Sequence, residues 1–149
     1  MKTSHIVQIS LASITILAAQ LCYAQSPVGL WKTIDDKTGK VKSLVRITET
    51  NGELQGKIEK LFREPDQEQQ PKCDKCEGAN KDQPLLGMTI LFGLKKNGDE
   101  YNGGSILDPA NGKIYNSKLS VTDNNKKLDV RGYIGISLFG RSQTWLREE

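Results

Sequence analysis

Apolar and polar residues alternate with a period of two along most of the chain after residue 25. Val45 and Ile47 alternate with Arg46 and Thr48, and the same alternation recurs at 54–59 and 128–131. A period of two places successive side chains on opposite faces of a strand. No window predicts an amphipathic helix longer than two turns. The pattern predicts eight short strands, at residues 28–34, 41–49, 53–62, 86–95, 100–107, 113–121, 126–134 and 143–147.

Turn residues separate these strands and predict that consecutive strands are antiparallel neighbours. Asn-Gly pairs at 51–52, 97–98 and 111–112 are typical of type I′ turns, and Asp-Asn-Asn at 123–125 predicts another turn. A meander of eight strands has two exposed edges, which closure into a barrel removes. We therefore expect an all-β, antiparallel up-and-down barrel of about eight strands. An open β-sandwich is the alternative.

Residues 1–24 have the pattern of a secretory signal peptide. Lys2 precedes an apolar stretch over 6–21, and Cys-Tyr-Ala at 22–24 places small residues where a signal peptidase cleaves. The apolar stretch contains two glutamines and is shorter than the roughly 20 residues of a membrane span. An uncleaved anchor and a lipid attached to Cys22 are the alternatives. We expect one mature domain of residues 25–149, periplasmic or secreted, with no transmembrane segment.

Removal of this leader changes the chemistry that the chain can carry. The only histidine, His5, is lost, and the formal net charge falls from +3 to +2 when Lys2 leaves. Without histidine the mature chain has no Ser-His-Asp triad, no Cys-His pair and no histidine metal ligand. A small positive charge is not the strongly basic balance of a nucleic-acid binder. We expect no enzymatic activity, no catalytic residue, no cofactor, no metal ion and no nucleic-acid partner.

The two ends of the mature chain carry motifs that resemble a known barrel. Gly29-Leu30-Trp31 opens the first predicted strand, and Trp145-Leu146-Arg147 closes the last. A Gly-x-Trp with a late arginine over the indole is similar to the barrel-closing device of the calycins, the lipocalin-like superfamily. The resemblance implies a calycin-like barrel whose closing residues are Gly29, Trp31, Trp145 and Arg147.

A longer resemblance covers essentially all of residues 26–148. Cys-Asp-Lys-Cys at 73–76, Gly-Gly-Ser-Ile-Leu-Asp-Pro at 103–109 and Leu-Asp-Val-Arg-Gly-Tyr at 128–133 are among the motifs that carry it. The chain resembles a bacterial exported family catalogued as domain of unknown function 2147. This resemblance implies export and a calycin-like barrel, and it brings no established activity or substrate.

Residues 63–83 form a long polar segment that contains Cys73 and Cys76. Connections of this length inside a domain are usually functional or disordered. A disulfide fits two cysteines in an exported chain. Thiol–disulfide exchange, favoured by lysines beside the thiols, and a zinc site are the alternatives. We expect the segment to be an exposed loop that contributes almost nothing to the core.

Four residues are candidates for ligand binding. Arg46 and Arg131 lie on strands whose opposite faces are apolar, so they face water, or an anionic ligand if the barrel is oriented the other way. Tyr133 and Phe139 belong to the apolar run 133–140, which contains two glycines. This run predicts either a strand corner packed on the core or an apolar lip for ligand entry or for a partner.

Three functions are consistent with these observations. The first is binding of a small apolar or amphipathic ligand, or of an envelope partner; the second is a ligand-free structural or interaction protein of the envelope. The third is a thiol–disulfide role for Cys73 and Cys76. The interior volume discriminates the first two, because a cavity of about 300 Å³ or more favours a ligand. A structural role predicts a barrel filled by Phe62, Met88, Phe92 and Leu119.

Overall fold

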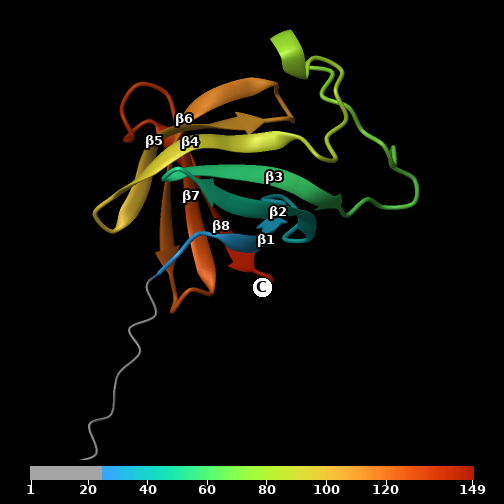
Figure 1. Ribbon diagram of the computed structural model, residues 1–149. Coiled ribbons are helices and arrows are strands. Elements are labelled where there is room, and N and C mark those ends of the chain that lie inside the picture. The colour runs from blue at the N-terminus through green and yellow to red at the C-terminus, as the bar shows by residue number, and fades with distance from the viewer. Residues whose placement is uncertain (1–24) are drawn as a thin grey trace, which may run out of the picture.

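The computed structural model describes residues 25–149, in which eight antiparallel strands close into a barrel in chain order (Figure 1). The predicted fold class is confirmed, and the closed barrel excludes the open sandwich. The predicted signal peptide lies outside the described residues. The strands are β1 (Gly29–Ile34), β2 (Val41–Thr50), β3 (Glu53–Leu61), β4 (Thr89–Asn97), β5 (Glu100–Asp108), β6 (Lys113–Thr122), β7 (Lys127–Tyr133) and β8 (Gly140–Arg147).

The tight turns differ in detail from the prediction. Asn51 and Gly52 both have positive φ, at 52° and 77°, as a type I′ turn requires. At 97–98 and 111–112 only the glycine has positive φ, so these two turns are not type I′. All three residues of 123–125 have positive φ. The three Asn-Gly dipeptides therefore located their turns correctly but specified the turn type only once.

The alternation of each strand gives the barrel its interior. Val45 and Ile47 of β2 are buried, as are Leu128 and Val130 of β7. Odd-numbered strands run toward one end of the barrel, which we call the mouth, and even-numbered strands run away from it. The connections 35–40, 62–88, 109–112 and 134–139 therefore gather at the mouth. In residues 25–149, no helix has the length and apolar character needed to cross a membrane.

The longest connection, between β3 and β4, projects beyond the barrel wall and then returns to it (Figure 1). It contains one single-turn 3₁₀ helix, η1 (Gly78–Asn80). Cys73 and Cys76, which lie in this segment, are 0% and 2% exposed and pack in the main core cluster. The expectation that the segment contributes almost nothing to the core is therefore wrong, because its central part packs against the turn between β5 and β6.

Candidate functional site

The end of the barrel opposite the mouth is closed by Trp31. Its side chain is fully buried, and its indole N–H donates a hydrogen bond of 2.8 Å to the Pro27 carbonyl. Arg147 pairs with Trp31 across the seam between β1 and β8. The guanidinium carbon of Arg147 lies 4.1 Å from the indole centroid. Such a cation–π contact contributes about 0.5–2 kcal/mol, with the larger values where water is excluded.

Arg147 also connects the chain segments around this closed end. It donates hydrogen bonds to the carbonyls of Ser26 at 2.6 Å and Val28 at 3.0 Å, and to the carbonyl of Asn125. Desolvation lowers the pKa of Arg147. A methyl group on Gly29 would lie 2.6 Å from a guanidinium nitrogen of Arg147, so only glycine leaves room for the arginine. Gly29 and Arg147 thus cap the buried indole together.

The mouth leads into a cavity of about 590 Å³, which we call the calyx. This volume lies within the range of about 300–1,000 Å³ for small-molecule sites. None of the four side chains predicted to fill the barrel lines the calyx in the described chain, and Phe62 is exposed. The apolar wall is formed by inward side chains of β3, β4, β5, β7 and β8, namely Ile58, Ile90, Ile106, Val130 and Trp145.

Trp145 belongs to this calyx rather than to the closed end. It sits two residues before Arg147 on β8, on the same inward face, and is 2% exposed. The resemblance to calycins therefore grouped four residues that the structure divides between two places. Gly29, Trp31 and Arg147 lie together at the closed end, and Trp145 lines the calyx.

A few polar groups interrupt the apolar wall, and they pair with one another. The hydroxyls of Thr33 and Ser43 are buried and lie 2.7 Å apart. Gln143 accepts a hydrogen bond of 3.3 Å from the Trp145 indole and donates one of 2.9 Å to Asp36. A mostly apolar wall with a few placed polar groups is typical of small-molecule sites.

The charged side chains that line the calyx are predominantly cationic. Lys42, Arg63 and Arg141 line the calyx together with one carboxylate, that of Asp108. Asp36, from the connection between β1 and β2, forms an ion pair with Arg141. Arg63 donates a hydrogen bond of 3.0 Å to a backbone carbonyl. The mouth therefore favours a ligand whose polar end is anionic rather than cationic.

Arg46 does not line the calyx, and it takes the first of the two orientations predicted for it, facing outward. Its neighbours Val45 and Ile47 occupy the inward face of β2, which directs Arg46 outward. There it forms ion pairs of 2.7 Å with Glu59 and 2.6 Å with Glu149. Hydrogen bonds to Glu59 first, and then to Glu149, raise the pKa of Arg46.

Arg131 also lies outside the calyx, again in the outward orientation that was the first of the two predicted. It donates hydrogen bonds of 2.7 Å to the Ser137 carbonyl, 3.2 Å to the Leu138 carbonyl and 2.9 Å to the Ser142 hydroxyl. Its guanidinium group therefore fixes the connection between β7 and β8 from outside. Arg131 shapes the mouth without contacting the cavity.

Tyr133 and Phe139 do line the calyx, at the two ends of the connection between β7 and β8. The alternative of a strand corner packed on the core is wrong, because the apolar side chains of this connection point into solvent. We call four of them the apolar lip: Ile134, Ile136, Leu138 and Phe139, which are 67%, 60%, 74% and 68% exposed.

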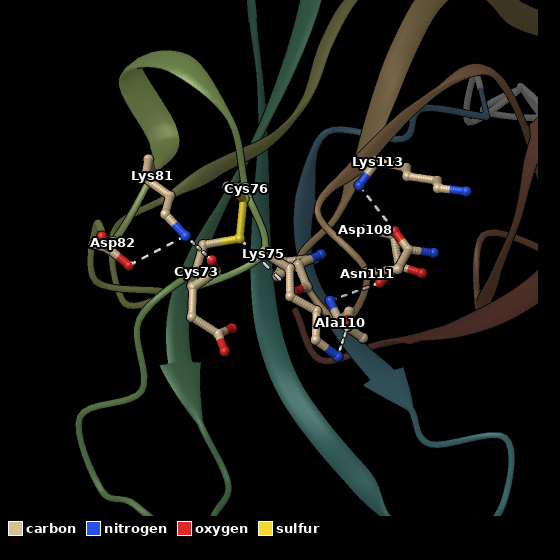
Figure 2. The surroundings of a disulfide bond; sticks show 11 residues. Cys73, Lys75, Cys76, Lys81, Asp82, Asp108, Ala110, Asn111 and Lys113 are labelled. Atoms are coloured by element: carbon tan, nitrogen blue, oxygen red, sulfur yellow. Dashed lines mark hydrogen bonds and ion pairs between the residues drawn. A yellow bond between two sulfur atoms is a disulfide. The ribbon is translucent and has the colours of Figure 1, made fainter.

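Cys73 and Cys76 form a disulfide, as predicted. Figure 2 shows this bridge beside the turn between β5 and β6, where Lys75 donates a hydrogen bond of 3.2 Å to the Ala110 carbonyl. Gly112, in the same turn, lies so close to the bridge segment that a methyl group there would be 2.7 Å from the Cys76 nitrogen. Because both sulfurs are bonded to each other and buried, neither is available as a thiolate ligand for zinc.

Sequence reasoning missed the polar residues of the calyx. Thr33 and Ser43 continue the inward faces of Trp31 and Val45, so the available signal was a polar residue at a position that the alternation assigns to the core. Ser117 gives a similar signal. It is fully buried, and its hydroxyl has no hydrogen-bond partner in the part of the chain that the structure describes.

The closed barrel with a capped end and an apolar calyx is a lipocalin-like fold. It is similar in structure to protein HP1028 from the human pathogen Helicobacter pylori, which belongs to the lipocalin family. The TM-score is 0.69, with 21% sequence identity over 82% of each chain. At this identity the likeness shows the fold alone.

The family follows from the sequence itself. Residues 29–147 match the family described as "Uncharacterized protein conserved in bacteria (DUF2147)", and the chain belongs to this family. The resemblance identified from the sequence is thereby confirmed. No curated protein matches the chain.

Proposed function

We propose that this protein is exported and binds a small apolar or amphipathic molecule in the calyx. The observation that carries the proposal is the cavity of about 590 Å³ with apolar walls. A barrel of this size without a ligand gains stability when side chains fill its interior, because an apolar cavity costs free energy in proportion to its volume. The unfilled calyx therefore supports ligand binding over a purely structural role.

The charges at the mouth narrow the class of ligand. Lys42 and Arg63 line the calyx, and Arg141 lies beside them although Asp36 neutralises it. An amphiphile with an apolar body and one anionic group would place its body against Ile106 and its neighbours. Its anionic group would then meet these cations at the mouth.

The thiol–disulfide role has weaker support. Exchange begins with attack of a thiolate on an accessible sulfur. Cys73 and Cys76 are both buried against the barrel, so an attacking thiol does not reach them in the folded protein. A bridge in this place supports a structural role for the disulfide.

Titration with 1-anilinonaphthalene-8-sulfonate tests the proposal. This dye has an apolar ring system and one anionic group, and its fluorescence rises in apolar surroundings. Ile106→Trp adds volume inside the calyx, whereas Ile114→Trp makes the same change at an exposed position on the next strand. We expect Ile106→Trp to weaken dye binding about tenfold or more, and Ile114→Trp to leave it unchanged.

Decanoate provides the second arm of this experiment. It should displace the dye from the wild-type protein, because both compounds have an apolar body and one negative charge. Near-UV circular dichroism should show that both tryptophan variants are folded. Equal dye affinity in Ile106→Trp and the wild type would contradict binding in the calyx.

The exported state has its own test. Intact-mass measurement of the protein recovered from its own host should give a chain that begins at Gln25. A mass that includes residues 1–24, or acyl chains on Cys22, would contradict cleavage at this site. The same measurement under non-denaturing conditions should detect a bound small molecule and the Cys73–Cys76 disulfide.

A further inference from the structure

The apolar lip concentrates exposed apolar surface at one place. Four of the nine exposed large apolar side chains of the described chain lie within the six residues 134–139. Exposed apolar residues scattered singly are normal on protein surfaces, whereas a contiguous group marks an interaction site. The calyx itself does not account for Ile136 and Leu138, because neither lines it.

The lip is held in this exposed conformation by its own hydrogen bonds. The Ile134 amide donates to the Phe139 carbonyl at 3.1 Å, and the Phe139 amide donates to the Ile136 carbonyl at 3.1 Å. Arg131 binds the carbonyls of Ser137 and Leu138 from the outer face of β7. The apolar side chains are therefore presented to solvent by a fixed backbone, which lowers the entropic cost of binding to a surface.

Two arginines flank the lip along the chain. Arg131 precedes the lip and Arg141 follows it, and residues 130–147 contain no aspartate or glutamate. Asp36 neutralises Arg141, but in residues 25–149 no carboxylate forms an ion pair with Arg131. An apolar protrusion with a cationic flank complements the headgroup region of an anionic bilayer, where apolar side chains insert and cations meet phosphate.

The lip is also continuous with the calyx. Ile134 and Phe139 belong to the exposed group and line the cavity at the same time. We propose that the apolar lip docks the open end of the barrel on an anionic lipid bilayer, so that an amphiphile passes between the bilayer and the calyx without crossing water. The membrane docking is argued from the apolar lip alone. The passage of an amphiphile into the calyx rests in addition on the proposed function, ligand binding in the calyx.

Flotation with lipid vesicles tests the docking. The vesicles contain phosphatidylethanolamine and phosphatidylglycerol, and the full mature protein is used. Ile136→Ser combined with Leu138→Ser removes apolar surface from the lip. We expect this variant to partition onto the vesicles about tenfold or more weakly than the wild type, because the inserted apolar area supplies most of the binding.

A matched control changes exposed apolar residues elsewhere. Val28→Ser combined with Leu146→Ser alters two exposed apolar side chains away from the mouth, and it should float like the wild type. Vesicles of phosphatidylcholine alone should bind the wild type about fivefold more weakly, since one unpaired arginine contributes about that much on an anionic surface. Equal flotation of the lip variant and the wild type would overturn the proposal.

The two proposals fail in distinguishable ways. The lip variant should bind the naphthalene dye as the wild type does, since Ile136 and Leu138 do not line the calyx. Ile106→Trp should lose dye binding and still float. If Ile106→Trp keeps both dye binding and flotation, ligand binding in the calyx is contradicted and the membrane docking is not. A wild-type protein that ignores vesicles, or that forms a dimer abolished by the lip variant, contradicts the membrane docking alone.

Discussion

Replacement of Gly112 by alanine tests how the disulfide segment is attached to the barrel. Gly112 has a φ of 74°, and a methyl group there would lie 2.7 Å from the Cys76 nitrogen and closer still to the Lys75 carbonyl. Carbon normally packs about 3.5–4.0 Å from its neighbours, so the segment must move away from the turn between β5 and β6. The chain provides a control in Gly52, which has a φ of 77° and nothing within 4 Å of its added methyl group.

The comparison of Gly112→Ala with Gly52→Ala separates two contributions to the loss in free energy of unfolding. A left-handed backbone costs alanine about 1–2 kcal/mol, and this cost applies to Gly52→Ala and Gly112→Ala alike. Overpacking against the Lys75–Cys76 backbone adds about 1–3 kcal/mol in Gly112→Ala alone. We therefore expect Gly112→Ala to lower the free energy of unfolding by about 1–3 kcal/mol more than Gly52→Ala does.

Equilibrium unfolding in urea measures this difference, and limited proteolysis locates it. Gly112→Ala should be cleaved faster between Arg63 and Lys81, because the undocked segment opens more readily than the barrel. Gly52→Ala should be cleaved at the wild-type rate. A difference in unfolding free energy below about 0.5 kcal/mol would refute the reasoning, since the two sites would then differ only within the variation of surface substitutions.

Three further predictions concern buried groups, and urea unfolding measures each of them. Trp31→Ala should lower the free energy of unfolding by about 3–5 kcal/mol, and a loss below about 1 kcal/mol would contradict its place in the core. Replacing both Cys73 and Cys76 with alanine should cost about 2 kcal/mol from the lost ring and leave the barrel folded; unfolding of the barrel would contradict this. Thr33→Val and Ser43→Ala should each cost about 1–3 kcal/mol, because each leaves one buried hydroxyl unpaired. The double variant should cost less than their sum, and strict additivity would contradict the hydroxyl pair.

The fold could be predicted from the sequence because its determinants are local. Strand positions follow from alternation within each segment, and the connections follow from turn residues between them. The end of β8 at Arg147 matched the prediction, but its start did not. Ile134, Ile136 and Leu138 alternate with Gly135 and Ser137 as they would in a strand, so the sequence did not show that β7 ends at Tyr133 and β8 begins at Gly140.

The calyx was harder to predict because inward positions change character along the barrel. Near the closed end an inward position such as Val45 is apolar, as the hydrophobic effect requires. Near the mouth the inward positions include Gln143 and Arg141, because that end is open to solvent. A polar residue at an inward position therefore indicates that the position lies near the mouth. A single sequence does not show independently how far each position lies from the mouth, so these residues were not recognised as inward.

Burial of the disulfide segment could not be predicted from its composition. Residues 63–83 are almost entirely polar, and polar connections usually lie in water. The burial of Cys73 and Cys76 depends on surfaces far along the chain, at Leu107 and Gly112. The glycine of the Asn-Gly pair at 111–112 was assigned to turn geometry. Gly112 is also required because the backbone at Lys75 and Cys76 approaches it closely, and this approach depends on the tertiary structure.

The two ends of the barrel place different demands on the chain, which explains how stability and a cavity coexist. At the closed end Arg147 joins three segments and covers Trp31, so closure of the sheet does not depend on the mouth. The seam between β1 and β8 has only two residue pairs, both near this end. The mouth can therefore expose Phe139 and leave the calyx unfilled, at a cost in stability that packing at the closed end offsets.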